Sequence, residues 1–186
     1  TKSELTPADS LLNPRRPNIL LILMESCGGR VVGCTEGNTK VTPHLDSLAR
    51  EGVFFSHCYA NSFRTDRGTI CTFSGYPSFP DASVMKMPAK SRVLPSIAGA
   101  LRSVGYDTEF LYGGDKNFTN MNSYFLATGY NRVLGDVDFP VSMRKTSPWG
   151  VCDHLMFDQL RQNIDRQPKN KPVSYTHLTL PTKRIV

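Results

Sequence analysis

The chain has 186 residues, of which 39% are hydrophobic and 20% charged, and its formal net charge is +6. This length allows one domain with a sizeable core, and the longest apolar run is far shorter than the roughly 20 residues that a membrane span needs. The positive charge favours anionic partners, but no basic stretch is interleaved with aromatic residues, so no nucleic-acid partner is expected.

The amino-terminal segment, residues 1–16, is polar and is interpreted as a linker that enters the first strand. Thr1 is not an initiator Met and no signal-peptide pattern follows it, so we expect the start to be a cut. The five cysteines form no CxxC pair, which argues against a zinc site, and their spacing leaves open a disulfide such as Cys27–Cys34.

The first predicted strand is the apolar run Ile19–Met24, whose length is typical of a fully buried strand. Glu25 follows it directly. In an open α/β sheet, chemistry collects just beyond the carboxyl ends of the strands, so Glu25 is a candidate site residue. Taken alone, a Glu in this position could equally cap a helix or pair with an arginine.

The remaining elements alternate between helices and strands, with connections of helix length. This alternation predicts an α/β fold with a mostly parallel sheet and helices on both faces. In chain order we predict a helix at 44–51 after Thr42 as N-cap and Pro43, a strand at 53–57, a helix at 66–74 ending at Gly75, a loop at 77–93, a helix at 95–103, a strand at 107–112, a short helix at 120–127 and a helix at 151–167 that buries Leu155, Leu160 and Ile164.

A second candidate, Thr65, lies in the polar and basic segment 62–69, just before a predicted helix. A hydroxyl at a helix start and a carboxylate at a strand tip are the parts of a metal-assisted phosphoryl or sulfuryl transfer site. Arg64 and Arg67 could neutralise charge there, or could simply belong to a solvated surface. Thr65 alone could equally be an N-cap.

The carboxyl-terminal segment 173–186 is predicted to be a non-native tail. Residues 174–186 do not continue the α/β pattern and resemble a translated sequencing-adapter read-through. The alternative is an ordinary terminal strand. Residues 17–172 are therefore taken as the amino-terminal part of a longer domain, which we expect to run on past Pro172 with other sequence.

Two stretches, 16–22 and 42–53, resemble the amino-terminal half of the sulfatase group in the alkaline-phosphatase superfamily, and the resemblance covers roughly residues 16–160. Sulfatases carry paired aspartates where this chain has Met24-Glu25-Ser26, and a Cys or Ser that becomes formylglycine where it has Thr65. A threonine cannot form that aldehyde. Glu25 with Thr65, and the later segment 149–153, look like the lipoteichoic-acid-synthase-like phosphoglycerol transferases.

This resemblance implies that Glu25 and Thr65 bind a divalent metal, with Mn first and Mg, Ca or Zn possible, and that Thr65 is the nucleophile. It implies transfer of a phosphoglycerol-type head group from an anionic lipid or phosphodiester donor to an envelope glycan or lipid, through a phosphothreonine. Arg64, Arg67 and Asp115 are the candidate substrate-binding residues, although Asp115 also suits a turn. The alternatives are a phosphodiester or sulfate-ester hydrolase of the same fold and a non-catalytic extracytoplasmic binding domain.

The resemblance also implies that residues 17–172 belong to a sulfatase-like catalytic domain. It implies a bacterial membrane protein in which this domain is extracytoplasmic, anchored by amino-terminal helices that are absent from this chain. Thr119 and Met121 stand where the family has a Trp-x-Arg element, so a guanidinium fork for phosphate is missing there. The family completes its metal site with a later Asp-His pair, and His154 lies too early to belong to it. We therefore expect residues 1–186 alone to be inactive. The oligomeric state is left open.

Overall fold

The computed structural model describes residues 16–35, 37, 41–168 and 170–180. Within these residues, four strands form one sheet with the order β1-β4-β2-β3, and every neighbouring pair is parallel. The predicted mostly parallel α/β sheet is therefore confirmed. The strands are β1 (Ile19–Leu23), β2 (Asp107–Tyr112), β3 (Arg132–Leu134) and β4 (Val173–Leu178).

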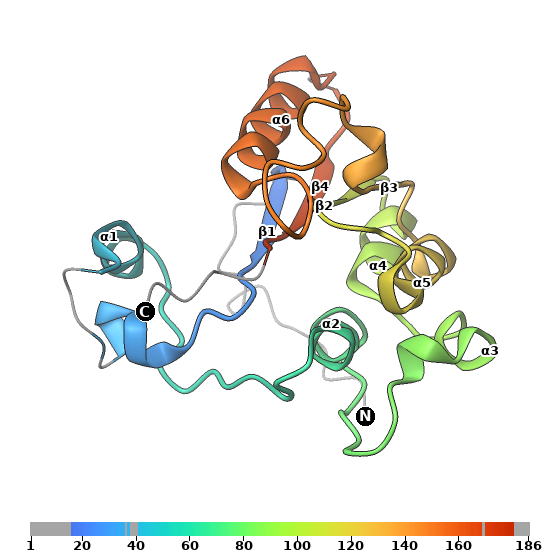
Figure 1. Ribbon diagram of the computed structural model, residues 1–186, viewed down its shortest axis with the longest axis horizontal. Helices are drawn as coiled ribbons and strands as arrows, with labels where there is room; N and C mark the ends of the chain where they lie inside the picture. Colours follow the sequence, from blue (N-terminus) through green and yellow to red (C-terminus); the bar gives the residue numbers. More distant parts are fainter. Residues whose placement is uncertain (1–15, 36, 38–40, 169, 181–186) are drawn as a thin grey trace.

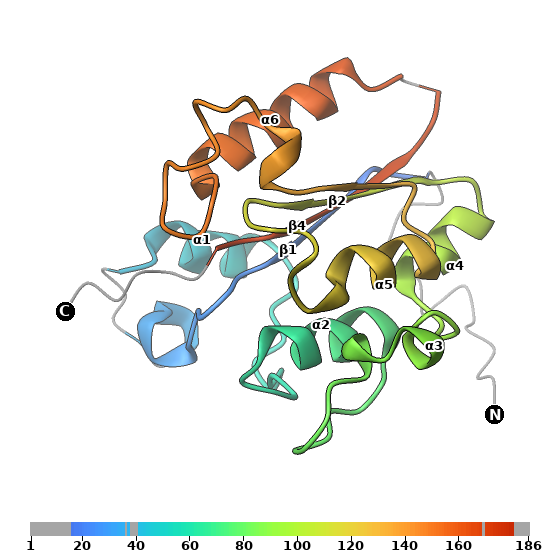
Figure 2. The same cartoon turned by 45° about the vertical axis from the view of Figure 1, so that its right-hand side comes forward.

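Helices cover both faces of this sheet (Figures 1 and 2). Helix α6 packs on one face, while α2, α4 and α5 lie on the other. The α-helices are α1 (Pro43–Glu51), α2 (Thr65–Ser74), α3 (Pro88–Ser91), α4 (Ile97–Ser103), α5 (Met121–Thr128) and α6 (Asp153–Arg166), and short 3-10 helices occupy Gly29–Val31, Gly33–Thr35, Val84–Lys86, Phe118–Asn120 and Asp136–Asp138.

Strand β2 contributes to both layers of the core because successive side chains of a strand point to opposite faces. Phe110 and Tyr112 join the cluster that contains residues of α2, α4 and α5, whereas Leu111 joins the cluster that contains residues of α6. Phe110 and Leu111 are fully buried. Burying an apolar side chain of this size stabilises the fold by about 1.5–3 kcal/mol, so β2 anchors the sheet.

The helix ends follow local sequence signals. Helix α2 ends at Gly75, whose φ of 62° is the left-handed conformation that glycine adopts without a steric penalty. Helix α4 begins after Ser96, whose hydroxyl accepts a hydrogen bond from the Gly99 N–H at 2.8 Å. At α1, however, the Thr42 side chain does not cap the helix as predicted; its hydroxyl accepts from the Gly33 N–H at 3.0 Å.

The predicted strand at 53–57 does not form, and this segment is coil and turn with Val53 and Phe55 exposed. A strand needs a partner that completes its hydrogen-bond ladder, and no described strand pairs with this segment. The predicted loop at 77–93 contains α3, and β3 was not predicted because its three residues are too few for a periodic pattern. In α6, Leu160 is buried as predicted, whereas Ile164 is 37% exposed.

Residues 173–178 were expected to lie outside the α/β pattern, but they are part of the sheet. They form β4, which lies between β1 and β2 and pairs with both in parallel register. Every side chain of β4 is buried. The segment therefore has the geometry of the ordinary strand that was kept as the alternative, and its origin as a non-native tail stays a prediction.

Candidate active site at the carboxyl edge of the sheet

Glu25 and Thr65 meet at the carboxyl edge of the sheet, although 40 residues separate them in sequence. The Thr65 hydroxyl donates a hydrogen bond to Glu25 Oε2 at 2.8 Å. Glu25 lies two residues beyond β1, and Thr65 is the first residue of α2. Both side chains are half-buried, so the pair is accessible from solvent. Ser26, next in the chain, donates to Glu25 Oε1 at 3.4 Å and has a left-handed φ of 57°.

The start of α2 carries an ordered arginine. Arg64 Nε contacts Asp66 Oδ1 at 3.3 Å, and the arginine side chain is 47% exposed while that of Asp66 is 3% exposed. Burial alone would raise the pKa of Asp66, but the nearby Ser83 hydroxyl and the Arg64 guanidinium outweigh it and hold that pKa below its usual value. Asp66 therefore stays ionised and keeps Arg64 beside Thr65.

Arg67 lies on the first turn of α2 and is half-buried. Its Nε atom is buried and has no hydrogen-bond partner among the described residues. A buried guanidinium N–H without a partner is costly, so Arg67 Nε lowers the stability of this turn unless an acceptor reaches it. Thr65 also lies at the amino-terminal end of α2, where the helix dipole is positive. This end of the helix favours negative charge near Thr65.

A divalent cation at this site would find two oxygen donors, the Glu25 carboxylate and the Thr65 hydroxyl. Hard divalent cations take about six oxygen ligands, so these two residues fit part of a coordination shell. Among the described residues, no group of three or more His, Cys, Asp or Glu side chains could hold a metal. The donor chemistry therefore fits a divalent metal, with the remaining ligands to come from elsewhere.

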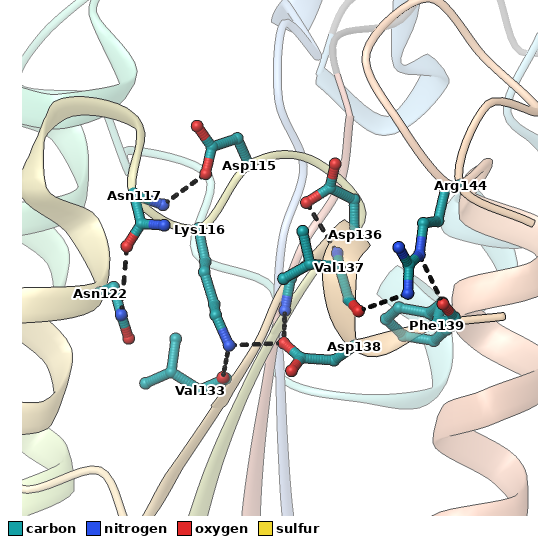
Figure 3. A network of polar contacts seen from close by, with 11 residues as sticks. Asp115, Lys116, Asn117, Asn122, Val133, Asp136, Val137, Asp138, Phe139 and Arg144 are labelled. Atoms are coloured by element: carbon teal, nitrogen blue, oxygen red, sulfur yellow. Dashed lines mark hydrogen bonds and ion pairs between the residues drawn. The ribbon is translucent and has the colours of Figure 1, made fainter. Parts of the chain in front are cut away.

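Asp115 lies in the turn that follows β2. It is exposed, and its Oδ1 accepts from the Asn117 N–H at 2.8 Å, as expected for a turn residue. Beside it, Asp136 begins the 3-10 helix after β3, and its backbone N–H donates to the Gly114 carbonyl at 3.0 Å. Figure 3 shows the carboxyl groups of Asp115 and Asp136 pointing the same way, beyond the ends of the strands.

Tyr112, the last residue of β2, is a site residue that sequence reasoning missed. It is 8% exposed, and its hydroxyl has no hydrogen-bond partner among the described residues. Burial first, and then the charges of Glu25, Asp115, Asp136 and Asp153, raise the pKa of Tyr112 to about 12. Its position at a strand end was the available signal, but a tyrosine in a buried strand is usually a core residue.

The Tyr112 ring lies directly over the turn. A Cβ atom on Gly114 would come within 2.7–2.9 Å of its Cε1, Cζ and hydroxyl oxygen. The phenol can occupy this place only because residue 114 has no side chain. Tyr112 therefore packs on the turn that leads to Asp115, and it lies near enough to Glu25 for the charge of that carboxylate to raise its pKa.

The chain is similar to proteins of a known family over most of its length. The family model described as Sulfatase matches residues 17–180. The ulvan-active sulfatase of Formosa agariphila is 34% identical over 126 residues, which are 60% of this chain and 21% of that protein. Phosphoglycerol transferase I of Salmonella arizonae is 24% identical over 161 residues, 82% of this chain and 21% of that protein.

Two solved structures have the same fold. A protein in the alkaline phosphatase superfamily from Vibrio parahaemolyticus superposes with a TM-score of 0.81 and 30% identity over 91% of this chain and 41% of that one. The lipoteichoic acid synthase LtaP from Listeria monocytogenes gives 0.79 and 15% identity over 92% of this chain and 42% of that one. The chain thus spans about a fifth of these curated relatives and about two fifths of these structures.

Proposed function

The chain belongs to the sulfatase family, and on that premise we propose that it is part of a metal-dependent transferase that moves a phosphoglycerol-type head group from a lipid donor to an envelope glycan or lipid. The family is one of enzymes, and its superfamily generally depends on divalent metals. One observation carries the proposal: the Thr65 hydroxyl donates to Glu25 Oε2 at 2.8 Å. An alcohol at a helix start held by a carboxylate has the chemistry of a nucleophile rather than of an N-cap.

Thr65 is the nucleophile in this proposal. Its proton is directed at Glu25 Oε2, which leaves an oxygen lone pair for in-line attack on the donor phosphorus. The new Thr65 O–P bond forms as the bond from phosphorus to the diacylglycerol oxygen breaks, and that oxygen leaves with the proton that Thr65 gave up to Glu25. An acceptor hydroxyl then attacks the phosphothreonine diester, takes the head group and returns the proton to Thr65.

The residues around Thr65 stabilise the charge that develops on the phosphoryl oxygens. Arg64 is held beside the site by Asp66, and Arg67 adds a second positive charge on the first turn of α2. A divalent metal, with Mn²⁺ as the first choice, would be held by Glu25 and Thr65 and would supply Lewis-acid activation of the hydroxyl and the phosphoryl group. Thr65 cannot become formylglycine, which favours phosphodiester over sulfate-ester chemistry.

A hydrolase of the same fold is the second candidate, and the similarity to a protein named as an ulvan-active sulfatase supports it. The two candidates share Thr65 and differ only in what attacks the covalent intermediate. Products separate them, because a transferase labels an acceptor and a hydrolase releases the free head group.

No described helix has both the length and the apolar character that crossing a bilayer requires. We propose that the domain works on the outer side of a bacterial cell membrane, where a lipid donor and an envelope acceptor meet. The name of the relative phosphoglycerol transferase I supports the transfer of a phosphoglycerol group, the reaction that would take place there.

The test uses the full-length protein with Mn²⁺ and phosphatidylglycerol that carries labelled glycerol. Thr65→Ala should lower turnover by at least ~10³-fold and abolish covalent labelling, because the attacking oxygen is lost. Thr72→Ala, on the exposed side of the same helix, is the matched control and should keep both. Full activity in Thr65→Ala, or label on another residue, would show that Thr65 is not the nucleophile.

A further inference from the structure

A pocket of about 630 Å³ lies at the turns that follow β2 and β3. This volume is within the range of about 300–1,000 Å³ that small-molecule sites occupy. The turns after β2 and β3 form one side of the pocket, and the segment 144–150 forms the other. Its lining consists of Asp115, Asp136, Arg144, Lys145, Thr146, Ser147, Pro148, Trp149 and Gly150.

The backbone holds this pocket open without a ligand. The Val151 N–H donates to the Gly113 carbonyl at 2.8 Å, and the Ser147 N–H donates to the Gly150 carbonyl at 2.9 Å. Gly150 has a φ of 137°, and a Cβ there would come within 2.0 Å of the Gly113 oxygen. The 147–151 turn therefore packs directly on the turn after β2, which makes the pocket a fixed feature of the fold.

Two carboxylates project into the pocket with acceptor capacity to spare. One oxygen of Asp115 accepts from the Asn117 N–H, and one oxygen of Asp136 accepts from the Val137 N–H, both at 2.8 Å. The second oxygen of each has no hydrogen-bond donor among the described residues. Lys116 does not neutralise them, because its ammonium group contacts Asp138 at 2.6 Å and the Val133 carbonyl at 3.2 Å (Figure 3).

The cations of the pocket are a poor match for an anionic ligand. The Arg144 guanidinium already donates to the Phe139 carbonyl at 2.8 Å and to the Val137 carbonyl at 2.9 Å (Figure 3). A phosphate or a sulfate would meet the remaining N–H groups of Arg144 and the exposed Lys145, but these two cations only balance the charges of Asp115 and Asp136. The carboxylates would repel such an anion, whereas they accept hydrogen bonds readily from hydroxyl groups.

Trp149 supplies the apolar element of the pocket. Its side chain is 60% exposed, which is unusual for so large an aromatic residue. An exposed indole beside two carboxylates suits a sugar ring, which offers an apolar C–H face to the indole and a rim of hydroxyl groups to the carboxylates. Tyr112 adds a second feature: the residue is 8% exposed, its hydroxyl makes no hydrogen bond with the described residues, and the charges of Glu25 and Asp115 act on it.

We propose that this pocket binds the carbohydrate acceptor of the reaction. Trp149 stacks on a sugar ring, while Asp115 and Asp136 accept hydrogen bonds from its hydroxyl groups. The Tyr112 hydroxyl, which lies over Gly114 next to Asp115, donates to a sugar oxygen at the border of the pocket. This inference rests on the proposed transferase function and narrows the acceptor from glycan or lipid to glycan.

The test uses the only tryptophan of the 186-residue chain as its probe. Neutral disaccharides (maltose, cellobiose and lactose) are titrated while Trp149 emission is recorded. Binding of at least one should shift the emission saturably, with a dissociation constant of roughly 1–10 mM, as expected for a few weak contacts. Asp115→Asn and Asp136→Asn should each weaken binding about tenfold, because each replaces a charged acceptor.

The matched control is Asp165→Asn, an exposed acid on α6, which should bind as the parent does. Trp149→Ala, followed by calorimetry, should abolish binding, and far-UV circular dichroism of every variant verifies the fold. Tyr112→Phe keeps the ring and should weaken binding severalfold. Absence of any emission change with all three sugars would overturn the inference, as would saturable binding of inorganic phosphate or sulfate in their place.

Thr65→Ala separates this inference from the proposed function. The variant should bind the disaccharide as the parent does, because Thr65 does not line the pocket. If sugar binding is present while head-group transfer is absent from the full-length protein, the transferase proposal fails and the sugar site stands. If transfer occurs and no sugar binds, the acceptor assignment alone is wrong.

Discussion

At the scale of single residues, the site depends on a hydrogen bond between side chains 40 positions apart. Neither Glu25 nor Thr65 is unusual in its local sequence, and each has an ordinary structural explanation. Their contact at 2.8 Å gives them a joint chemical meaning, because it directs the hydroxyl proton to the carboxylate. Arg64 and Arg67 border this pair, whereas Asp115 lies in the neighbouring turn and is assigned here to the acceptor pocket.

Asp138 offers a prediction on pH at this scale. Burial tends to raise its pKa, but the Gly135 N–H at 2.8 Å and the Lys116 ammonium at 2.6 Å lower it below the usual value. A carboxyl whose pKa is depressed by folding stabilises the fold above its unfolded pKa, and loses this contribution as the pH falls through the folded pKa. Asp138 should therefore stabilise the fold at neutral pH and not in acid.

Asp138→Asn should lower the free energy of unfolding by about 1–2 kcal/mol at pH 7, since it removes a charged acceptor that is partly screened by solvent. The deficit should fade as the pH falls below about 3.9, the ordinary aspartate value. Urea unfolding at several pH values measures it, with Asp165→Asn as the exposed control. A deficit that stays constant from pH 7 to pH 3 would contradict the role of the charge.

At the scale of elements, turns as well as strands and helices build the site. Strands β1 and β2 bring Glu25 and Tyr112 to one edge, and the first residue of α2 brings Thr65 to the same edge. The 147–151 turn then packs on the turn after β2. Close backbone approach of this kind requires glycine, which explains why Gly113 and Gly150 face each other.

Gly150→Ala tests this packing. A Cβ at residue 150 would meet the Gly113 oxygen at 2.0 Å, and the φ of 137° is itself unfavourable for alanine. We expect a loss of at least ~2 kcal/mol in the free energy of unfolding and a change in Trp149 emission as the turn moves.

The matched control is Gly28→Ala, where a new Cβ would meet nothing within 4 Å and φ is −77°. It should change the free energy of unfolding by less than about 0.5 kcal/mol. Equal effects of the two substitutions would show that the Gly113–Gly150 contact does not hold the pocket.

At the scale of the whole molecule, the centre of the sheet is well covered, whereas one face of the edge strand β1 is exposed. Both faces of β2 are buried, whereas Leu20 and Ile22 of β1 are 46% and 40% exposed. Leu21 and Leu23 pack against the cluster that includes residues of α2, α4 and α5, so the exposed pair lies on the opposite face of β1. The Glu25–Thr65 pair stands at the end of this same strand.

We expect residues 1–186 alone to show no Mn²⁺-dependent phosphodiester cleavage. Among the described residues, Glu25 and Thr65 supply two oxygen donors, and no cluster of three acidic, His or Cys side chains is present. Two donors are too few to hold the ion firmly. Turnover of a chromogenic phosphodiester, with and without Mn²⁺, measures this. Metal-dependent cleavage that Thr65→Ala abolishes would contradict the expectation.

Much of the fold followed from local patterns. The apolar run before Glu25 and the strand at 107–112 are long enough to identify, and Gly75 ends α2 as predicted. Local patterns failed for two segments. Strand β3 has only three residues and was not predicted. The run at 53–57 was predicted as a strand from its composition, but it has no partner strand among the described residues. Composition alone cannot say whether a partner is present.

The sequence by itself determined the class of fold, and it predicted Glu25 and Thr65 as the reactive residues and the branch of chemistry that a threonine permits. Tertiary structure alone decided that Thr65 and Glu25 touch, that the ring of Tyr112 lies over Gly114, and that Trp149 shares a pocket with Asp115 and Asp136. The physical reason is the range of the forces involved. Hydrophobic periodicity and capping act over a few neighbouring residues, whereas a site forms where parallel strands end together, at distances along the chain that no local pattern encodes.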